Sequence, residues 1–171
     1  MTVRPIRYLG DPVLRKPAKK VSRVDDSIRR LIADMTESMY AAHGVGIAAP
    51  QIGVGLRVVI IGMPDEEPFA LINPEVIKRS GERRLDEGCL SVPGYRGTVT
   101  RSLSVVVKAL DENGREVRVK AEGDMLAQAL EHETDHVNGL LYVDRLNAKT
   151  DLVKLAAPRT TPDGREGDEE A

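Results

Sequence analysis

The stretch His132-Glu133-Thr134-Asp135-His136 follows a run of apolar residues at helical spacing. Two histidines four residues apart on a helix project from one face, so they can hold a single metal ion. Glu133 is then placed to take a proton from a water that the metal activates. The pentapeptide also fits a charged, solvent-facing helix, but the chain has only three histidines and spends two of them here. The sequence therefore favours a metal-binding helix from about residue 124 to residue 137.

The third metal ligand has to come from elsewhere in the chain. Peptidases with this motif often use a later acidic residue or histidine, for which Asp151 and Glu166 are the late acids to consider. Cys89, the single cysteine, is the better candidate, because two histidines, a thiolate and an open fourth position form a hydrolytic centre. A free cysteine is usually a buried small hydrophobe. Here, however, the nearby Glu87 offers a carboxylate that can hydrogen-bond a ligand imidazole.

A glycine-rich stretch, Gly44-Val45-Gly46-Ile47-Ala48-Ala49-Pro50-Gln51, precedes the first predicted strand. It is no phosphate-binding loop, because the lysine is missing and the glycine spacing differs. Two interpretations stay open. The stretch forms either a turn with a small-residue packing surface, or a backbone that lies close to a bound substrate, with Gln51 presenting an amide donor. His43, alone at the end of the preceding helix, is expected to interact with the helix dipole.

The remaining pattern predicts an α+β fold. Apolar residues from Asp26 to Ala42 recur at three- and four-residue steps, which predicts an amphipathic helix that Gly44 can end. Because the strands do not alternate with helices, we expect mostly antiparallel sheets packed around the C-terminal HExxH helix. Residues 111–114 are turn formers and predict a hairpin. Strands are predicted at residues 56–61, 69–72, 75–79, 97–101, 103–110 and 115–120, after an extended, surface-wrapping start at residues 5–23.

The composition is that of a globular protein, with 41% hydrophobic and 30% charged residues among 171. We expect one catalytic domain over residues 1–158 and a disordered acidic tail over residues 159–171. The net charge of −2 argues against direct DNA binding. Residues 1–12 lack the apolar core of a signal peptide, and the longest aliphatic run, Val58 to Ile61, is too short to cross a membrane. A single cysteine excludes an internal disulfide and suits a reducing compartment, so we expect a cytoplasmic protein.

Three motifs in this order resemble the peptide deformylase family. Residues 44–51, 87–91 and 131–136 are similar to its GxGxAAxQ, EGCLS and QHExDH signatures, and residues 8–15 look like its opening, so that the resemblance covers about residues 5–147. The resemblance implies one divalent metal ion, with iron(II) as the physiological ion and zinc, nickel or cobalt able to substitute. The ligands that it implies are Cys89, His132 and His136.

The resemblance also implies a chemistry: a hydrolase of protein biosynthesis that removes the N-formyl group from formylmethionine of nascent peptides and releases formate. Glu133 would act as general acid and base. The Gln51 side-chain amide and the Leu90 backbone N–H would stabilise the oxyanion, and Gly46 would bind the peptide backbone. The methionine side chain needs an apolar pocket, whose expected walls are Val45, Leu85, Met125 and Ala129.

This chain departs from the family pattern at Glu131, where glutamine is usual, and at Val137, where leucine is usual. The first change adds a negative charge near the predicted site. The C-terminal region lacks the long basic helix by which some relatives dock on ribosomes, which leaves a transient ribosome contact open. Two alternatives remain: an HExxH-type metallopeptidase with a downstream acidic ligand, and a metal-stabilised binding module. A purely structural metal site would have no use for Glu133 and would close its fourth position.

Overall fold

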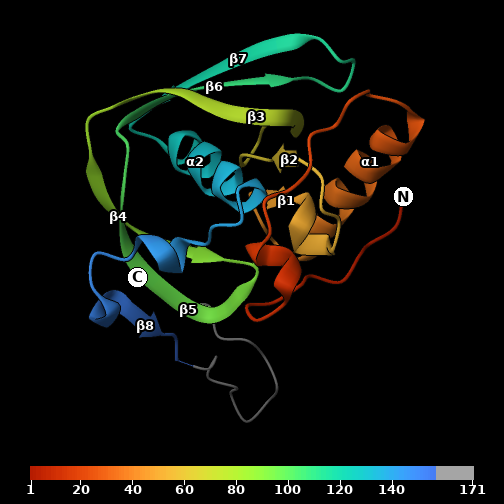
Figure 1. Cartoon of the computed structure of the whole chain (residues 1–171). Helices are drawn as coiled ribbons and strands as arrows, with labels where there is room; N and C mark the ends of the chain where they lie inside the picture. Colours follow the sequence, from red (N-terminus) through yellow and green to blue (C-terminus); the bar gives the residue numbers. More distant parts are fainter. Residues whose placement is uncertain (157–171) are drawn as a thin grey trace.

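Two antiparallel β-sheets curve around one helix in the computed structural model, which describes residues 1–156 (Figure 1). The larger sheet has the strand order β1-β2-β3-β6-β7, and the smaller one β4-β5-β8. The enclosed helix is α2 (Met125–Val137), and α1 (Asp26–Ala41) lies beside β1 and β2. The expected α+β fold, with antiparallel sheets around the HExxH helix and one earlier amphipathic helix, is confirmed. The expected domain boundary at residue 158 and the tail at residues 159–171 lie outside the described residues.

The strands are β1 (Gly46–Ala48), β2 (Val58–Ile61), β3 (Phe69–Ser80), β4 (Arg83–Cys89), β5 (Val92–Arg101), β6 (Ser104–Leu110), β7 (Glu116–Glu122) and β8 (Leu152–Lys154). Short 3-10 helices are η1 (Pro12–Arg15), η2 (Ala49–Ile52), η3 (Tyr142–Arg145) and η4 (Lys149–Asp151). The separate strands predicted at residues 69–72 and 75–79 are wrong, because β3 is continuous. Its ladder shifts register between Ile72 and Glu75, where Asn73 takes a φ of 53° and Pro74 cannot donate a hydrogen bond. Strands β1, β4 and β8 were not predicted.

The larger sheet is apolar on both faces, which places α1 and α2 on opposite sides of it. Val58 and Ile60 pack into the cluster that includes the buried side chains of α1, such as Met35. Val59 and Ile61 point the other way, into the cluster that includes Ala129 and Leu130 of α2. Alternate residues of a strand face opposite sides of a sheet. The uninterrupted aliphatic run of β2 therefore anchors both helices, and α2 is held against the sheet.

Capping residues fix where α2 begins and ends. The carboxylate of Asp124 accepts a hydrogen bond from Ala127 N at 2.8 Å. At the other end Gly139 takes a φ of +78°, and a Cβ placed there would lie 2.7 Å from the carbonyl oxygen of Arg15. Only glycine accepts both the backbone angle and the close approach. The C-terminal end of α2 is thus seated against the N-terminal segment.

Helix α1 ends differently from the sequence prediction. His43, rather than Gly44, takes the left-handed conformation, with a φ of 56°. The N–H of Gly44 donates to Met39 O at 2.9 Å and that of His43 to Tyr40 O at 3.0 Å, which is the usual pair of bonds closing a helix C-terminus. His43 therefore ends the helix through its backbone.

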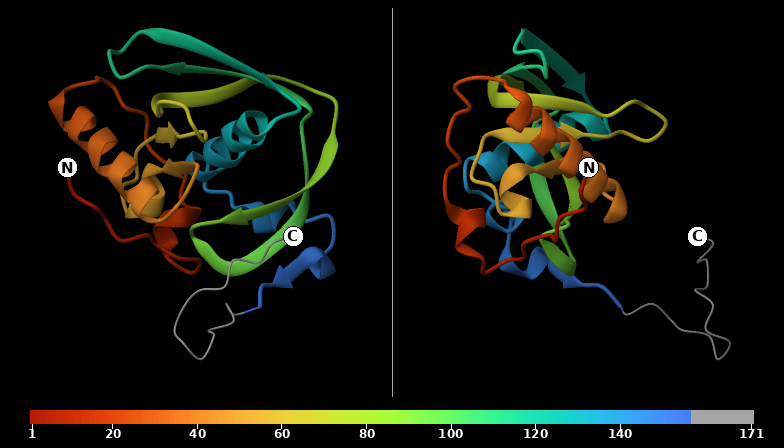
Figure 2. Two further views of the ribbon diagram at one scale, coloured as in Figure 1. Left: turned by 180° about the vertical axis from the view of Figure 1, so that it is seen from behind. Right: turned by 90° about the vertical axis from the view of Figure 1, so that its right-hand side faces the viewer.

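The N-terminal segment runs along the outside of the molecule (Figure 2), as expected for residues 5–23. It is tied to both sheets: Arg7 N donates to Gln51 O at 2.7 Å, and Leu9 N donates to Ser91 O at 2.8 Å. These bonds join the chain beside β1 to the chain between β4 and β5. Within residues 1–156, no helix combines the length and the apolar character that a membrane crossing needs.

Candidate metal centre

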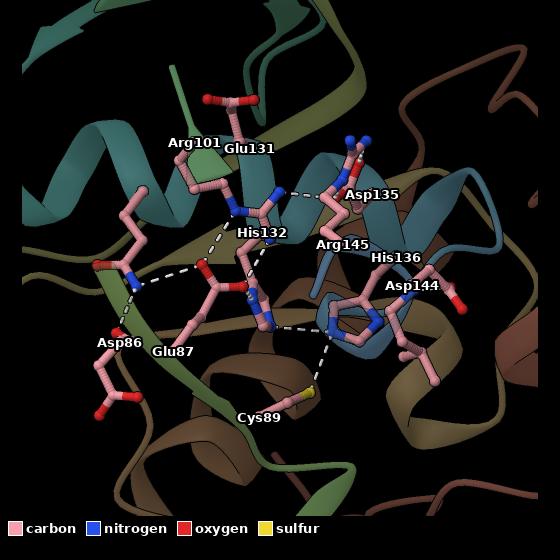
Figure 3. Close-up of polar contacts among 12 residues, drawn as sticks. Asp86, Glu87, Cys89, Arg101, Glu131, His132, Asp135, His136, Asp144 and Arg145 are labelled. Carbon is pink, nitrogen blue, oxygen red and sulfur yellow. Dashed lines mark hydrogen bonds and ion pairs between the residues drawn. The ribbon is translucent and has the colours of Figure 1, made fainter. Parts of the chain in front are cut away.

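Three side chains from two elements meet beside α2 (Figure 3). Cys89 stands at the end of β4, and His132 and His136 lie one turn apart on α2. The two Nε2 atoms are 3.2 Å apart, His136 Nε2 is 3.3 Å from Cys89 Sγ, and the three donor atoms lie within 4.8 Å of one another. The structure thus brings together the three residues that the sequence assigned to the metal.

This donor set fits a divalent ion. A tetrahedral site with usual metal–nitrogen and metal–sulfur bond lengths separates its ligand atoms by about 3.3 to 3.6 Å. The separations of 3.2 and 3.3 Å come close to that range. Asp151, one of the acids considered for a peptidase site, instead accepts a hydrogen bond from Ala148 N at 3.0 Å and is outside the cluster. Glu166, the other one, lies outside the described residues.

Glu87 orients the first histidine. Its Oε2 lies 2.7 Å from His132 Nδ1, which leaves Nε2 to face Cys89. The expected hydrogen bond between Glu87 and the imidazole of a candidate ligand is thus present at His132. Arg101 donates to both oxygens of the same carboxylate, at 3.0 and 2.6 Å. Burial alone would raise the pKa of Glu87, but the bonds from His132 and Arg101 outweigh it and hold the pKa at about 2.

Arg101 also joins the two elements that carry the metal-binding side chains. It is 2% exposed, and besides Glu87 of β4 it donates to Asp135 Oδ2 of α2 at 2.7 Å. Arg145 donates to the other oxygen of Asp135 at 2.7 Å. Removing one partner of such a buried network costs about 3 to 5 kcal/mol. Sequence reasoning missed Arg101 and Arg145, because only the fold brings them next to the motif.

Glu133 and Gln51 line the same cavity as Cys89 and His132. Glu133 is buried, and its Oε2 has no hydrogen-bond partner within residues 1–156. Burial raises its pKa to about 7, against the opposing effect of His132. The Gln51 carbonyl oxygen accepts from Ala48 N at 2.9 Å, so its NH₂ group turns toward Ser91 Oγ at 3.1 Å and Cys89 Sγ at 3.6 Å.

A cavity of about 650 Å³ opens over these residues. That volume is in the range of small-molecule and peptide sites. Leu85 is absent from this lining and packs against the cluster of Val92, Val99 and Tyr142, of which Val92 itself lines the cavity. Its place in the methionine pocket stays a prediction. Of the other residues that the sequence assigned to the site, His136 is absent from the lining. The rest line the cavity: Cys89, His132, Val45, Gly46, Gln51, Leu90, Met125, Ala129 and Glu133.

Comparison with known proteins identifies the family. The family model described as polypeptide deformylase matches residues 3–151. The chain belongs to the peptide deformylase family. The peptide deformylase of Dehalococcoides mccartyi is 49% identical over 164 residues, 95% of this chain and 98% of that one. The crystal structure of a peptide deformylase from Legionella pneumophila has a TM-score of 0.83 and 47% identity, and covers 88% of this chain and 89% of that one. A second, from Synechococcus elongatus in complex with actinonin, has a TM-score of 0.83 at 44% identity, over 86% and 81%.

Glu131, the departure from the deformylase motif, faces away from the three donor atoms. Its Oε1 accepts from Ser102 N at 2.7 Å, and its Oε2 lies 3.5 Å from Arg79 Nε. The added charge is therefore paired with a cation and a backbone donor on the far side of α2. Its contacts bind α2 to the connection between β5 and β6.

The pKa of Glu87 leads to a pH-dependent contribution to stability. Because the folded-state pKa of about 2 is below the ordinary value of 4.5, this contribution is fully present above pH 4.5 and is lost as the pH falls toward 2. The Tm difference between wild type and Glu87→Gln should therefore shrink as the pH is lowered through this window, measured by thermal scans. Glu112→Gln, an exposed change of the same chemistry, should follow the wild type throughout. A Tm difference between wild type and Glu87→Gln that stays constant with pH would show that the stabilisation does not come from the ionised carboxylate of Glu87.

Gly46 is expected to be required beside Glu133. A Cβ added at Gly46 would lie 2.5 Å from Glu133 Oε1 and 3.0 Å from its Cδ, so the carboxylate has to move. Displacements of this kind lower turnover, and Gly46→Ala should reduce kcat/KM about 10- to 100-fold with the metal content unchanged. Gly55→Ala is the matched control, because its Cβ meets nothing within 4 Å. Full activity of Gly46→Ala would show that the carboxylate does not need this position.

Proposed function

We propose that this chain hydrolyses the N-formyl group of formylmethionine at the start of newly made peptides and releases formate. The observation that carries the proposal is the cluster of Cys89, His132 and His136, two of which line an open cavity together with the buried Glu133. The same chain matches the polypeptide deformylase model over residues 3–151. A hydrolytic site needs this combination of metal donors, a base and room for a substrate.

Cys89, His132 and His136 would hold one divalent ion, for which we propose iron(II); zinc, nickel and cobalt suit the same donors. The soft thiolate and the two imidazoles support a transition metal over calcium or magnesium. When bound, the ion would act as a Lewis acid and lower the pKa of a water from 15.7 to about 7. The remaining steps belong to the protein's own side chains.

Glu133 moves the proton. Its Oε2 receives a proton from the attacking water and later returns it to the α-amine of the departing methionine. A carboxyl whose pKa is raised to about 7 suits both directions, since it is neither a very weak base nor a very weak acid near neutral pH. Burial, the cause of that shift, also keeps the carboxylate in place against Gly46.

The oxyanion of the tetrahedral intermediate would accept hydrogen bonds from the Gln51 amide and the Leu90 backbone N–H. Each such donor contributes about 3 kcal/mol to transition-state stabilisation. The bond from Ala48 N to the Gln51 oxygen supports this role, because it fixes which end of the amide faces the cavity. Gly46 would bind the peptide backbone of the substrate. Val45, Met125 and Ala129 would form the apolar walls for methionine.

The partners in this proposal are nascent formylmethionyl peptides, met in the cytoplasm with a transient ribosome contact. An unpaired cysteine in the metal centre supports a reducing compartment, because thiolates oxidise readily elsewhere. The slightly negative net charge of −2 gives no support to direct DNA binding.

The proposal can be tested on protein purified without oxygen. Metal analysis should give one ion per chain, and formyl-Met-Ala-Ser should yield formate until a chelator is added. Acetyl-Met-Ala-Ser and free Met-Ala-Ser are the comparison substrates for a peptidase. Cleavage of the Met–Ala bond, or chelator-insensitive formate release, would overturn the assignment.

A further inference from the structure

The strand β8 and Leu155, which follows it, lie beyond the residues matched by the deformylase family model, and Leu155 lines the main cavity. It pairs antiparallel with β5, with Arg96 opposite Val153 and Gly97 opposite Leu152. The ladder continues past the strand, because Leu155 N donates to Gly94 O at 2.8 Å. The segment is therefore held along β5, and its last bonded residue reaches the cavity.

The three apolar side chains of residues 152–155 differ in whether they line the cavity. Leu155, 47% exposed, lines the cavity together with Tyr95 and Arg96. Val153, 58% exposed, is no part of the lining. Leu152, one residue earlier, packs against the cluster of Val92, Val99 and Tyr142 beneath the sheet. Leu155 is thus an apolar side chain that neither the core nor the metal centre uses.

The wall around Leu155 carries little net charge. Arg96 and Asp86, which both line the cavity, form an ion pair at 2.6 Å. The proposed methionine walls come from other parts of the fold: Val45 lies before β1 of the larger sheet, and Ala129 lies on α2. A substrate held against those walls is an extended chain, and it advances about 3.3 Å per residue. Because those walls and Leu155 line one cavity, the residues after methionine lie on the way to the smaller sheet.

We propose that Leu155 is a specificity-determining residue that contacts the part of the peptide beyond its methionine and favours an apolar side chain there. This rests on the proposed function, in that the cavity takes a formylmethionyl peptide. The neutral Arg96–Asp86 pair gives no reason to prefer a charged side chain at this position. The contact adds affinity and leaves the reacting atoms untouched, so it acts on KM.

Steady-state kinetics on formyl-Met-Ala-Leu and formyl-Met amide test the proposal. Leu155→Ser should raise KM for the tripeptide about 5-fold, the size expected from losing part of an apolar contact, with kcat unchanged. KM for formyl-Met amide should not change, because that substrate ends before the wall. Leu155→Met should restore the wild-type value. Val153→Ser, two residues earlier in the chain and outside the cavity lining, should behave as the wild type.

Three results would overturn the inference: an equal change for formyl-Met amide, an equal change in Val153→Ser, or no change in Leu155→Ser. Equilibrium dialysis of the product Met-Ala-Leu measures the contact without turnover, and Leu155→Ser should weaken its binding by the same factor. If the wild type released no formate but bound Met-Ala-Leu in a Leu155-dependent way, the proposed function would fail and the contact would stand.

Discussion

Glu133→Gln should lower kcat for formate release by about 10²- to 10⁴-fold, the usual contribution of a general acid and base. The glutamine keeps the volume of the side chain against Gly46 and removes only its ability to accept and return a proton. The metal content should stay at the wild-type level, because Glu133 is not one of the three clustered donors. Single-turnover formate release and metal analysis on the same preparation measure both quantities.

Glu131→Gln is the matched control for this change. It lies on the same helix and is 6% exposed, against 5% for Glu133, but it contacts Ser102 N and Arg79 on the other side of α2. The same chemical change at this position should leave kcat close to the wild-type value. Near-normal turnover in Glu133→Gln, or an equal loss in Glu131→Gln, would show that Glu133 is not the proton carrier.

Much of the fold could be predicted from local patterns. The amphipathic helix after Asp25, the HExxH helix after Asp124 and the hairpin at residues 111–114 all carry their own start, stop or turn signals, and all three are present. Each of these features is stabilised largely by residues close in sequence. The three clustered candidate ligands were found for the same reason, since each lies in a short motif.

Strand β4 could not be predicted, because its stability comes from distant residues. Arg84, Asp86 and Glu87 have little preference for strands. The strand forms because β5 pairs with it and because Arg101, 14 residues after Glu87, satisfies the buried carboxylate. Nothing in the sequence around Arg101 reveals that partnership.

Leu85 is the expected wall of the methionine pocket that does not line the cavity directly. It packs against the cluster of Val92, Val99 and Tyr142, and of these Val92 lines the cavity. Sequence alone does not decide which side chains of a strand reach the surface of a pocket. Leu155, far from every motif in the sequence, lines the cavity because β8 pairs with β5.

Cys89→Ser should weaken metal binding by more than the 10- to 100-fold that is typical for losing an outer partner of a ligand. An alcohol is a harder and far less acidic ligand than a thiol. Ser91 N at 3.4 Å and Gln51 Nε2 at 3.6 Å both donate to the Cys89 sulfur, which holds it beside the two histidines. Competition with a chelator for cobalt measures the affinity, and formate release should fall with the loss of metal.

Ser91→Ala is the control for Cys89→Ser, because it changes the surroundings of Cys89 and not Cys89 itself. Ser91 Oγ accepts a bond from Gln51 at 3.1 Å but is not among the clustered donors, so this variant should keep its metal. Unchanged cobalt affinity in Cys89→Ser would remove Cys89 from the ligand set. The third ligand would then have to be sought downstream of α2, where a late acid such as Glu166 would make the site that of a peptidase. If Cys89→Ser loses its metal and Ser91→Ala does not, then β4 supplies a metal ligand. The buried Arg101 network, which joins β4 to α2, would then also hold the ligands in position.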